Sequence, residues 1–205
     1  MNEIEMSISE WWENAHATKS YYVSDFGGLK LWNSLNILPL IKNDSAILEI
    51  GVGNGKNTME LFKKGCNVHV LDISILALEK VRSYSTKQWL ESEIEDIPEN
   101  TFDAVISHLV SQHLSNDALL KQLKSIIPTL KPDGIFAMQF ACWLDEQIYD
   151  ESLGFQKTGY VCRTLDQMQN LVATAGGMIS WVSPDTVKFI NYRSCWYFIH
   201  IQKGV

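Results

Sequence analysis

A chain of 205 residues, 46% hydrophobic and 20% charged, predicts one globular domain and argues against a disordered chain. The net charge of −7 disfavours nucleic acid as a partner, because phosphate backbones need a basic stripe and the seventeen Lys and Arg residues are scattered. No apolar run approaches a membrane span and the first residues lack the basic start of a signal peptide, so we expect a cytoplasmic protein without a membrane partner.

The four cysteines are far apart in the sequence and form no C-x-x-C pair. This spacing indicates neither a disulfide framework nor a metal site, so we expect reduced, buried cysteines and no bound metal.

The N-terminal segment is rich in aromatic residues. Ser7 and Glu10 have the spacing of a capping box, which predicts a helix that begins near Ile8. The aromatic residues that could line a substrate site are Trp11, Trp12, Tyr21 and Tyr22. They favour two interpretations equally: a lid over a substrate, or a covering helix whose rings serve as core or as the contact of a homodimer.

From Ala46 onward, short apolar runs alternate with amphipathic segments, which predicts a parallel sheet with helices on both faces. The predicted strands are 46–50, 67–71, 88–92, 103–107, 134–140, 178–182 and 195–201. Ser115 and the capping box of Thr164 with Gln167 predict the starts of two helices. We therefore expect a single domain, with 1–42 as a helical lid and 43–205 as the core.

The most informative segment is the glycine turn that follows the first predicted strand. Its pattern is Gly51-x-Gly53-x-Gly55, and Asp72 closes the next strand 21 positions after Gly51 (72 − 51). A strand, a glycine turn and an acid at the next strand tip are typical of a nucleoside site. The spacing is tighter by one residue than the G-x-G-x-x-G pattern of pyrophosphate-binding loops.

This segment resembles motif I of the class I S-adenosylmethionine-dependent methyltransferases. The resemblance implies a Rossmann-like, doubly wound, seven-stranded and mostly parallel sheet whose last strand is antiparallel. It also implies S-adenosylmethionine as cofactor and S-adenosylhomocysteine as product. Glu49 would lie near the cofactor's amino group, the three glycines would admit its methionine part, and Asp72, followed by Ile73, would accept hydrogen bonds from the ribose hydroxyls.

Two further segments match the family in motif order. Glu93 and Ile94 resemble the stretch that contacts adenine, with Asp96 as the alternative acid. Ser107 ends a strand that resembles the one passing under the sulfonium. Next to it, His108 could be a general base or could only line the acceptor site. His113 could also act as a base, although a hydrogen bond that holds the turn is favoured.

The sequence therefore predicts methyl transfer to an oxygen or nitrogen of a small molecule, possible acceptors being a sugar or a natural-product intermediate. Two alternatives remain open at this point. An NAD-dependent oxidoreductase is disfavoured by the glycine spacing, and a non-catalytic nucleoside-binding scaffold would keep the fold without turnover.

Overall fold

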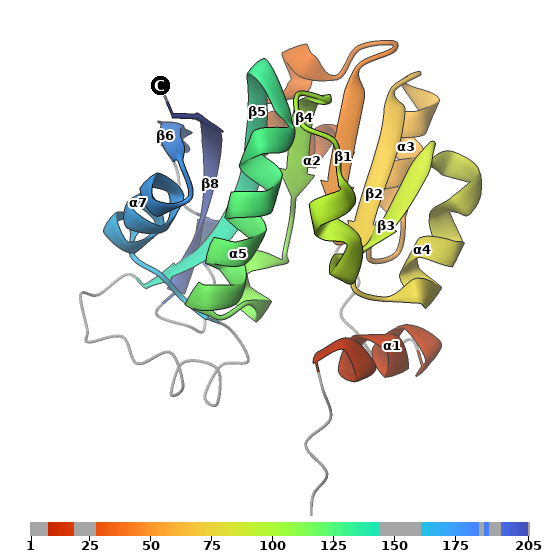
Figure 1. Cartoon of the computed structure of the whole chain (residues 1–205), viewed down its shortest axis with the longest axis horizontal. Coiled ribbons are helices and arrows are strands. Elements are labelled where there is room, and N and C mark those ends of the chain that lie inside the picture. The colour runs from red at the N-terminus through yellow and green to blue at the C-terminus, as the bar shows by residue number, and fades with distance from the viewer. Residues whose placement is uncertain (1–7, 19–27, 144–160, 185–186, 189–193, 205) are drawn as a thin grey trace, which may run out of the picture.

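The computed structural model describes residues 8–18, 28–143, 161–184, 187–188 and 194–204. Its centre is a sheet in the order β3-β2-β1-β4-β5-β8-β6, with a short strand, β7, that pairs with β8 beside this path (Figure 1). The strands are β1 (Ala46–Ile50), β2 (Asn67–Asp72), β3 (Lys87–Leu90), β4 (Phe102–Ser107), β5 (Leu130–Trp143), β6 (Gly177–Val182), β7 (Val187–Lys188) and β8 (Ser194–Lys203).

Strands β1 to β5 run parallel to one another, whereas β8 is antiparallel to β5, β6 and β7. The prediction of a mostly parallel, doubly wound sheet with an antiparallel last strand is therefore confirmed. The helices are α1 (Ile8–Thr18), α2 (Leu29–Ser34), α3 (Lys56–Lys63), α4 (Ile75–Val81), α5 (Asn116–Ile126) and α7 (Leu165–Thr174). Short 3-10 turns are η1 (Leu38–Leu40), η2 (Arg82–Tyr84), η3 (Glu91–Asp96), η4 (Ser111–His113) and η5 (Ile127–Thr129).

Two apolar layers hold the helices to the sheet, because alternate residues of each strand point to opposite faces. One face packs against α5 and α7, the other against α2, α3 and α4 (Figure 1). The strand residues of the first layer include Leu48, Ile50, Leu71, Val105, Phe136 and Met138. Those of the second include Ile47, Val68, Val70, Ala104, Ile106 and Ala137.

The predicted helix starts are correct. Ser115 and Thr164 each accept a hydrogen bond from a backbone N–H of the first turn. Helix α1 begins at Ile8, and its predicted cap Ser7 lies outside the described residues. The prediction of the third strand, 88–92, is displaced toward the C-terminus, because β3 spans Lys87–Leu90. The Glu93 carboxylate accepts the Leu90 N–H at 2.8 Å, which ends the strand in the turn η3.

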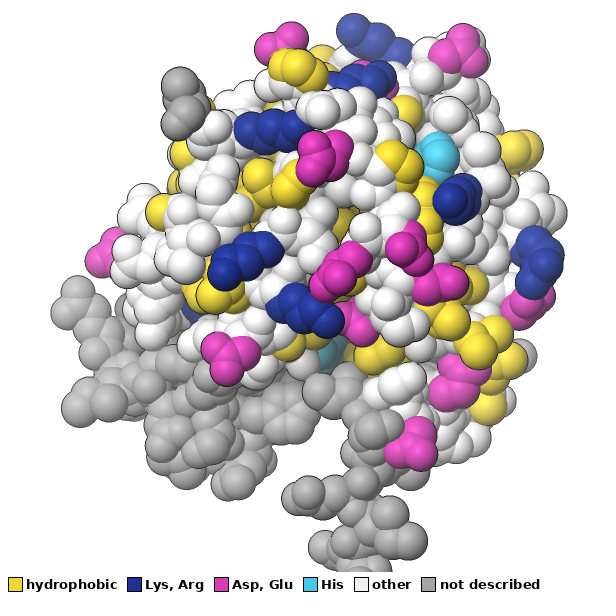
Figure 2. All heavy atoms as spheres, in the orientation of Figure 1, with side chains coloured by type: hydrophobic (Ala, Val, Ile, Leu, Met, Phe, Trp, Pro, Cys, Tyr) yellow, Lys and Arg dark blue, Asp and Glu magenta, His cyan; other side chains and the backbone are white. Residues whose placement is uncertain are grey.

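Charged side chains mix on the surface. On the face shown in Figure 2, Lys and Arg side chains lie among Asp and Glu side chains and form no continuous basic stripe. Among the described residues, no helix has both the length and the apolar character needed to cross a membrane. Cys66, Cys142 and Cys162 are buried, and the side chain of Cys195 lies outside the described part.

Candidate cofactor and acceptor site

The predicted site residues come together at one edge of the sheet. The carboxyl ends of β1, β2, β3 and β4 meet there because these four strands are parallel and adjacent. They place the glycine loop, Asp72, the turn η3 and Ser107 on the same side of the molecule. Ligands of open α/β sheets bind at this edge.

The glycine loop turns sharply from β1 into α3. Gly51, Gly53 and Gly55 have φ angles of 76°, 53° and 80°, in the left-handed region that favours glycine. The Gly51 N–H donates to the Leu71 carbonyl and the Gly55 N–H to the Val52 carbonyl, both at 2.8 Å. The loop is therefore fixed by its own backbone and by β2.

The three glycines differ in what a side chain would meet. A Cβ on Gly51 would overlap the Val110 side chain, and one on Gly55 would overlap Val81. A Cβ on Gly53 would have no described atom within 4 Å. Packing alone thus requires glycine at positions 51 and 55. At Gly53 no described atom fills the space, so a ligand could approach the backbone there.

We expect Gly53→Ala to lose cofactor affinity and Gly51→Ala to lose stability. Gly53→Ala should retain the fold, at a cost of about 1 kcal/mol for its positive φ, and weaken S-adenosylhomocysteine binding about tenfold or more. Gly51→Ala should instead lower the melting temperature strongly because of the Val110 overlap. Thermal unfolding and calorimetric titration of both variants separate the effects; equal cofactor affinity of Gly53→Ala and the wild type would contradict the assignment.

Asp72 holds the two loops at the tip of β2. Its Oδ2 accepts the Val52 N–H at 2.8 Å, and its Oδ1 accepts the Ser74 N–H at 2.9 Å. Burial raises the pKa of Asp72, and backbone N–H groups of Ser74, Val52, Gly53 and Ile73 oppose this rise. The carboxylate therefore organises the glycine loop and the start of α4, and its predicted ribose contact would use its remaining lone pairs.

Glu49 is the second buried acid of this edge. Its side chain points toward α3, where Thr58 Oγ1 donates to its Oε2 at 2.5 Å. Burial raises the pKa of Glu49 to about 7; the side chains of Thr58 and Asn57 oppose this rise and the nearby Asp72 adds to it. Two acids without a described cation between them form a site suited to a positively charged group.

The predicted adenine-binding residues follow β3. Glu93 is exposed and accepts the Leu90 N–H, whereas Ile94 is buried in the core and Asp96 is exposed. The backbone of Ile94 and either acid lie at the correct edge. Their contact with adenine stays a prediction.

Behind Ser107 the chain bends over the edge. Leu109 has a positive φ of 59°, and its N–H donates to Gln139 Oε1 at 3.3 Å. Ser111 Oγ then donates to the Gln139 carbonyl at 2.7 Å. Ser107 Oγ itself is fully buried and has no hydrogen-bond partner within the described structure.

The two candidate bases lie in this bend. Desolvation by burial lowers the pKa of His108 and of His113 to about 4. Both imidazoles are therefore neutral at pH 7, and each would be a weak general base. The His113 ring also contacts Trp12, with ring centroids 5.1 Å apart and planes at 78°.

Helix α1 covers the carboxyl edge (Figure 1). Glu13 accepts the Leu76 N–H at 3.2 Å, and Lys80 Nζ lies 2.9 Å from Nδ1 of the buried His16, which fixes α1 to α4. Trp12 is half-buried against His113, and Trp11 is 50% exposed. Tyr21 and Tyr22, the other predicted aromatic residues of the lid, lie outside the described residues.

Arg163 is a residue of this region that the sequence did not reveal. It is 1% exposed, and its guanidinium donates to Asn116 Oδ1 (2.7 Å), the Ser111 carbonyl (3.0 Å) and the Leu114 carbonyl (2.6 Å). These three bonds fix the segment 111–116, which carries His113. In the sequence, Arg163 is marked only by its position before Thr164, the N-cap of α7.

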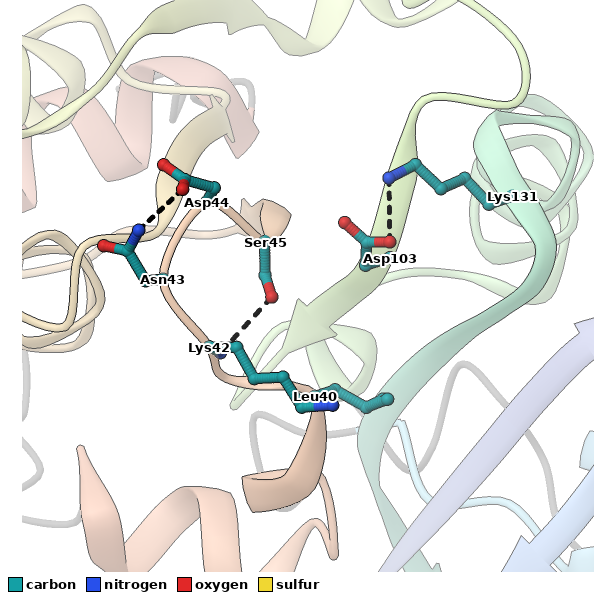
Figure 3. Close-up of a pocket in the computed structure, with 7 residues that line it drawn as sticks. All are labelled: Leu40, Lys42, Asn43, Asp44, Ser45, Asp103 and Lys131. Atoms are coloured by element: carbon teal, nitrogen blue, oxygen red, sulfur yellow. Dashed lines mark hydrogen bonds and ion pairs between the residues drawn. The ribbon is translucent and has the colours of Figure 1, made fainter.

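A polar hollow of about 370 Å³ lies elsewhere, at the amino ends of β1, β4 and β5 (Figure 3). Lys131 Nζ pairs with Asp103 Oδ1 at 2.8 Å, and the Ala46 N–H donates to Asp103 Oδ2 at 2.8 Å. Its remaining lining residues are Leu40, Lys42, Asn43, Asp44 and Ser45. None of the predicted site residues lines this hollow, and its ion pair holds the strand ends together.

The strand order, the glycine loop and the buried acids are those of the class I S-adenosylmethionine-dependent methyltransferase fold. The model of the methyltransferase domain family matches residues 48–138, which include the glycine loop, Asp72 and Ser107. This match decides against the oxidoreductase alternative, and S-adenosylmethionine is the cofactor of the class.

Relatives with this domain act on different acceptors. EEF1A lysine methyltransferase 2 of Danio rerio is 22% identical over 173 residues, covering 71% of this chain and 73% of that protein. Ubiquinone biosynthesis O-methyltransferase of Rickettsia bellii is 25% identical over 191 residues, covering 80% and 77%.

A solved structure shares the fold. It is the 1,6-didemethyltoxoflavin-N1-methyltransferase of Burkholderia thailandensis with bound 1,6-didemethyltoxoflavin and S-adenosylhomocysteine. Its TM-score is 0.69 at 14% identity, covering 100% of this chain and 94% of that one.

Proposed function

We propose that the protein methylates an oxygen or a nitrogen of a small molecule bound between α1 and the bend 107–113. The observation that carries this proposal is the contact of Trp12 with His113, because it closes the carboxyl edge with an aromatic wall. An aromatic wall that excludes water suits a planar or sugar-like acceptor better than an extended polymer.

The side chains of this site mainly bind and orient. The cofactor supplies, when bound, a methyl group that its sulfonium makes electrophilic. Glu49 and Asp72 present negative charge and acceptor oxygens at the cofactor side. Holding the acceptor in line can lower the barrier by about 7–11 kcal/mol. An amine acceptor would need no base, whereas a hydroxyl acceptor would use His108 or His113, neutral at pH 7.

Several broader features belong to the same proposal. The division into a lid (1–42) and a core (43–205), a cytoplasmic location, and the absence of membrane and nucleic-acid partners all agree with a metabolic enzyme. The scattered basic side chains of Figure 2 support the exclusion of nucleic acid. The exposed Trp11 supports a homodimer contact as the alternative role of α1.

A methyl-transfer screen against metabolite fractions tests the function, with S-adenosylhomocysteine release as the readout. Release that depends on a low-molecular-mass fraction and on intact Asp72 is the expected result. Release only with protein fractions would instead assign a protein acceptor, the class of acceptor of the relative named as a lysine methyltransferase. Cofactor binding without release in any fraction would favour the non-catalytic scaffold.

The lid predicts a specific effect of Trp12→Ala. Loss of the ring that faces His113 should lower kcat/KM for the acceptor about tenfold while the affinity for S-adenosylhomocysteine changes less than about twofold. Phe62→Ala is a suitable control, because this exposed ring lies near the end of α3 away from the carboxyl edge. Equal acceptor kinetics in Trp12→Ala and Phe62→Ala would exclude Trp12 from the site.

A further inference from the structure

The acid Glu49 is connected to the N-terminal part of the chain through α3. Trp32, on α2, is 1% exposed, and its Nε1–H donates to Asn57 Oδ1 at 2.6 Å. An indole N–H can only donate, so this bond fixes which end of the amide faces Trp32. The Asn57 amide nitrogen must therefore point the other way.

That nitrogen is the buried, unpaired end of the amide, and the Asn57 side chain acts on the pKa of Glu49. Asn57 favours the ionised form of Glu49, yet its Nδ2 is buried and has no acceptor at hydrogen-bond distance within the described structure. We therefore place Nδ2 near the carboxyl but beyond a formed hydrogen bond. Because an unpaired buried donor is costly, this arrangement favours any event that puts a full negative charge on Glu49.

None of the other described groups that act on Glu49 carries a positive charge. Asp72 on β2 is the charged side chain that acts on Glu49 in the described structure. Thr58 of α3 donates to Glu49 Oε2, and β4 places Ile106 beside it in the sheet register. A positive charge must therefore come from a ligand.

We propose that Trp32 and Asn57 are positioning residues that prepare Glu49 to ionise when the cofactor's ammonium group arrives, so that cofactor binding releases a proton. The inference rests on the cofactor class and on the proposed place of its amino group. The carboxylic acid loses its proton to the buffer, and the resulting carboxylate accepts hydrogen bonds from Asn57 and from the ligand. The N-terminal α2 thereby acts on cofactor binding without touching the cofactor.

Calorimetric titration with S-adenosylhomocysteine in buffers of different ionisation enthalpy measures this proton. At pH 7 the wild type should release about half a proton, rising toward one at pH 6 and falling toward zero at pH 9, because Glu49 titrates near pH 7. Glu49→Gln should bind with no proton release. Release that persists in Glu49→Gln would assign the proton to another group, such as Asp72, and overturn the proposal.

Trp32→Phe tests the positioning role. Without the Nε1–H the Asn57 amide is no longer fixed, so the pH midpoint of proton release should rise by roughly one unit and the affinity at pH 7 should fall about fivefold. Trp89→Phe is the matched control, since Trp89 is also buried but its Nε1 has no partner within the described structure. An unchanged midpoint in Trp32→Phe would overturn the connection. If Trp32→Phe is unstable, Asn57→Leu gives the same test, and absence of any S-adenosylhomocysteine binding to the wild type would instead refute the cofactor site itself.

Discussion

Replacing Arg163 with methionine is expected to lower the free energy of unfolding by about 3–5 kcal/mol, because it leaves buried acceptors without a donor. Arg163 is buried and donates to one side-chain oxygen and two carbonyl oxygens of the segment 111–116. Methionine has a similar length and no polar hydrogen, so the change removes the donors while filling much of the space. Urea unfolding should show a lower midpoint.

A matched substitution on the surface provides the control. Arg82 forms an exposed ion pair with Glu79, and such pairs contribute less than about 1 kcal/mol. Arg82→Met should therefore unfold close to the wild type. Similar losses in the two variants would show that the burial of Arg163 has no special role in stability.

Glu49→Gln is expected to stabilise the cofactor-free protein at neutral and alkaline pH. The pKa of Glu49 is raised from 4.5 to about 7 in the folded state. Below pH 4.5 the side chain is protonated in both states; between 4.5 and 7 it ionises first in the unfolded chain, so the stability of the wild type falls as pH rises. A shift of this size corresponds to about 3 kcal/mol above pH 7.

The variant cannot titrate at this position, so its stability relative to the wild type should rise by that amount between pH 4.5 and pH 7 and then remain constant. In melting temperature the gain is roughly 6–12 °C for a chain of this length. Glu60→Gln is the control, because Glu60 pairs with Lys63 on the surface. A difference between Glu49→Gln and the wild type that does not depend on pH would contradict the raised pKa.

The local signals of the sequence predicted much of the fold. The glycine spacing, the strand alternation and the caps at Ser115 and Thr164 depend on residues close together in the chain, and the structure has all of them. The strand predicted at 88–92 runs two residues past the end of β3 at Leu90. The Glu93 carboxylate stabilises the turn after Leu90 by accepting the Leu90 N–H.

The interactions that tune the site could not be predicted in the same way. Trp32 and Asn57 are 25 positions apart, and Arg163 lies 47 positions from Asn116. No spacing rule relates such pairs, because the sheet topology brings them together. A buried arginine is also uncommon, so composition argues against finding one.

The position of β8 has a consequence for the synthesis of the protein. β8 is the last described strand along the chain, yet it lies between β5 and β6. While residues 194–203 are still inside the ribosome, the outer edge of β5 therefore has no partner, although every predicted cofactor contact has already been translated. An unpaired strand beside a buried apolar layer is a template for aggregation. Nascent chains of this enzyme thus pass through a stage that already has the cofactor-contact residues and still needs protection along one edge.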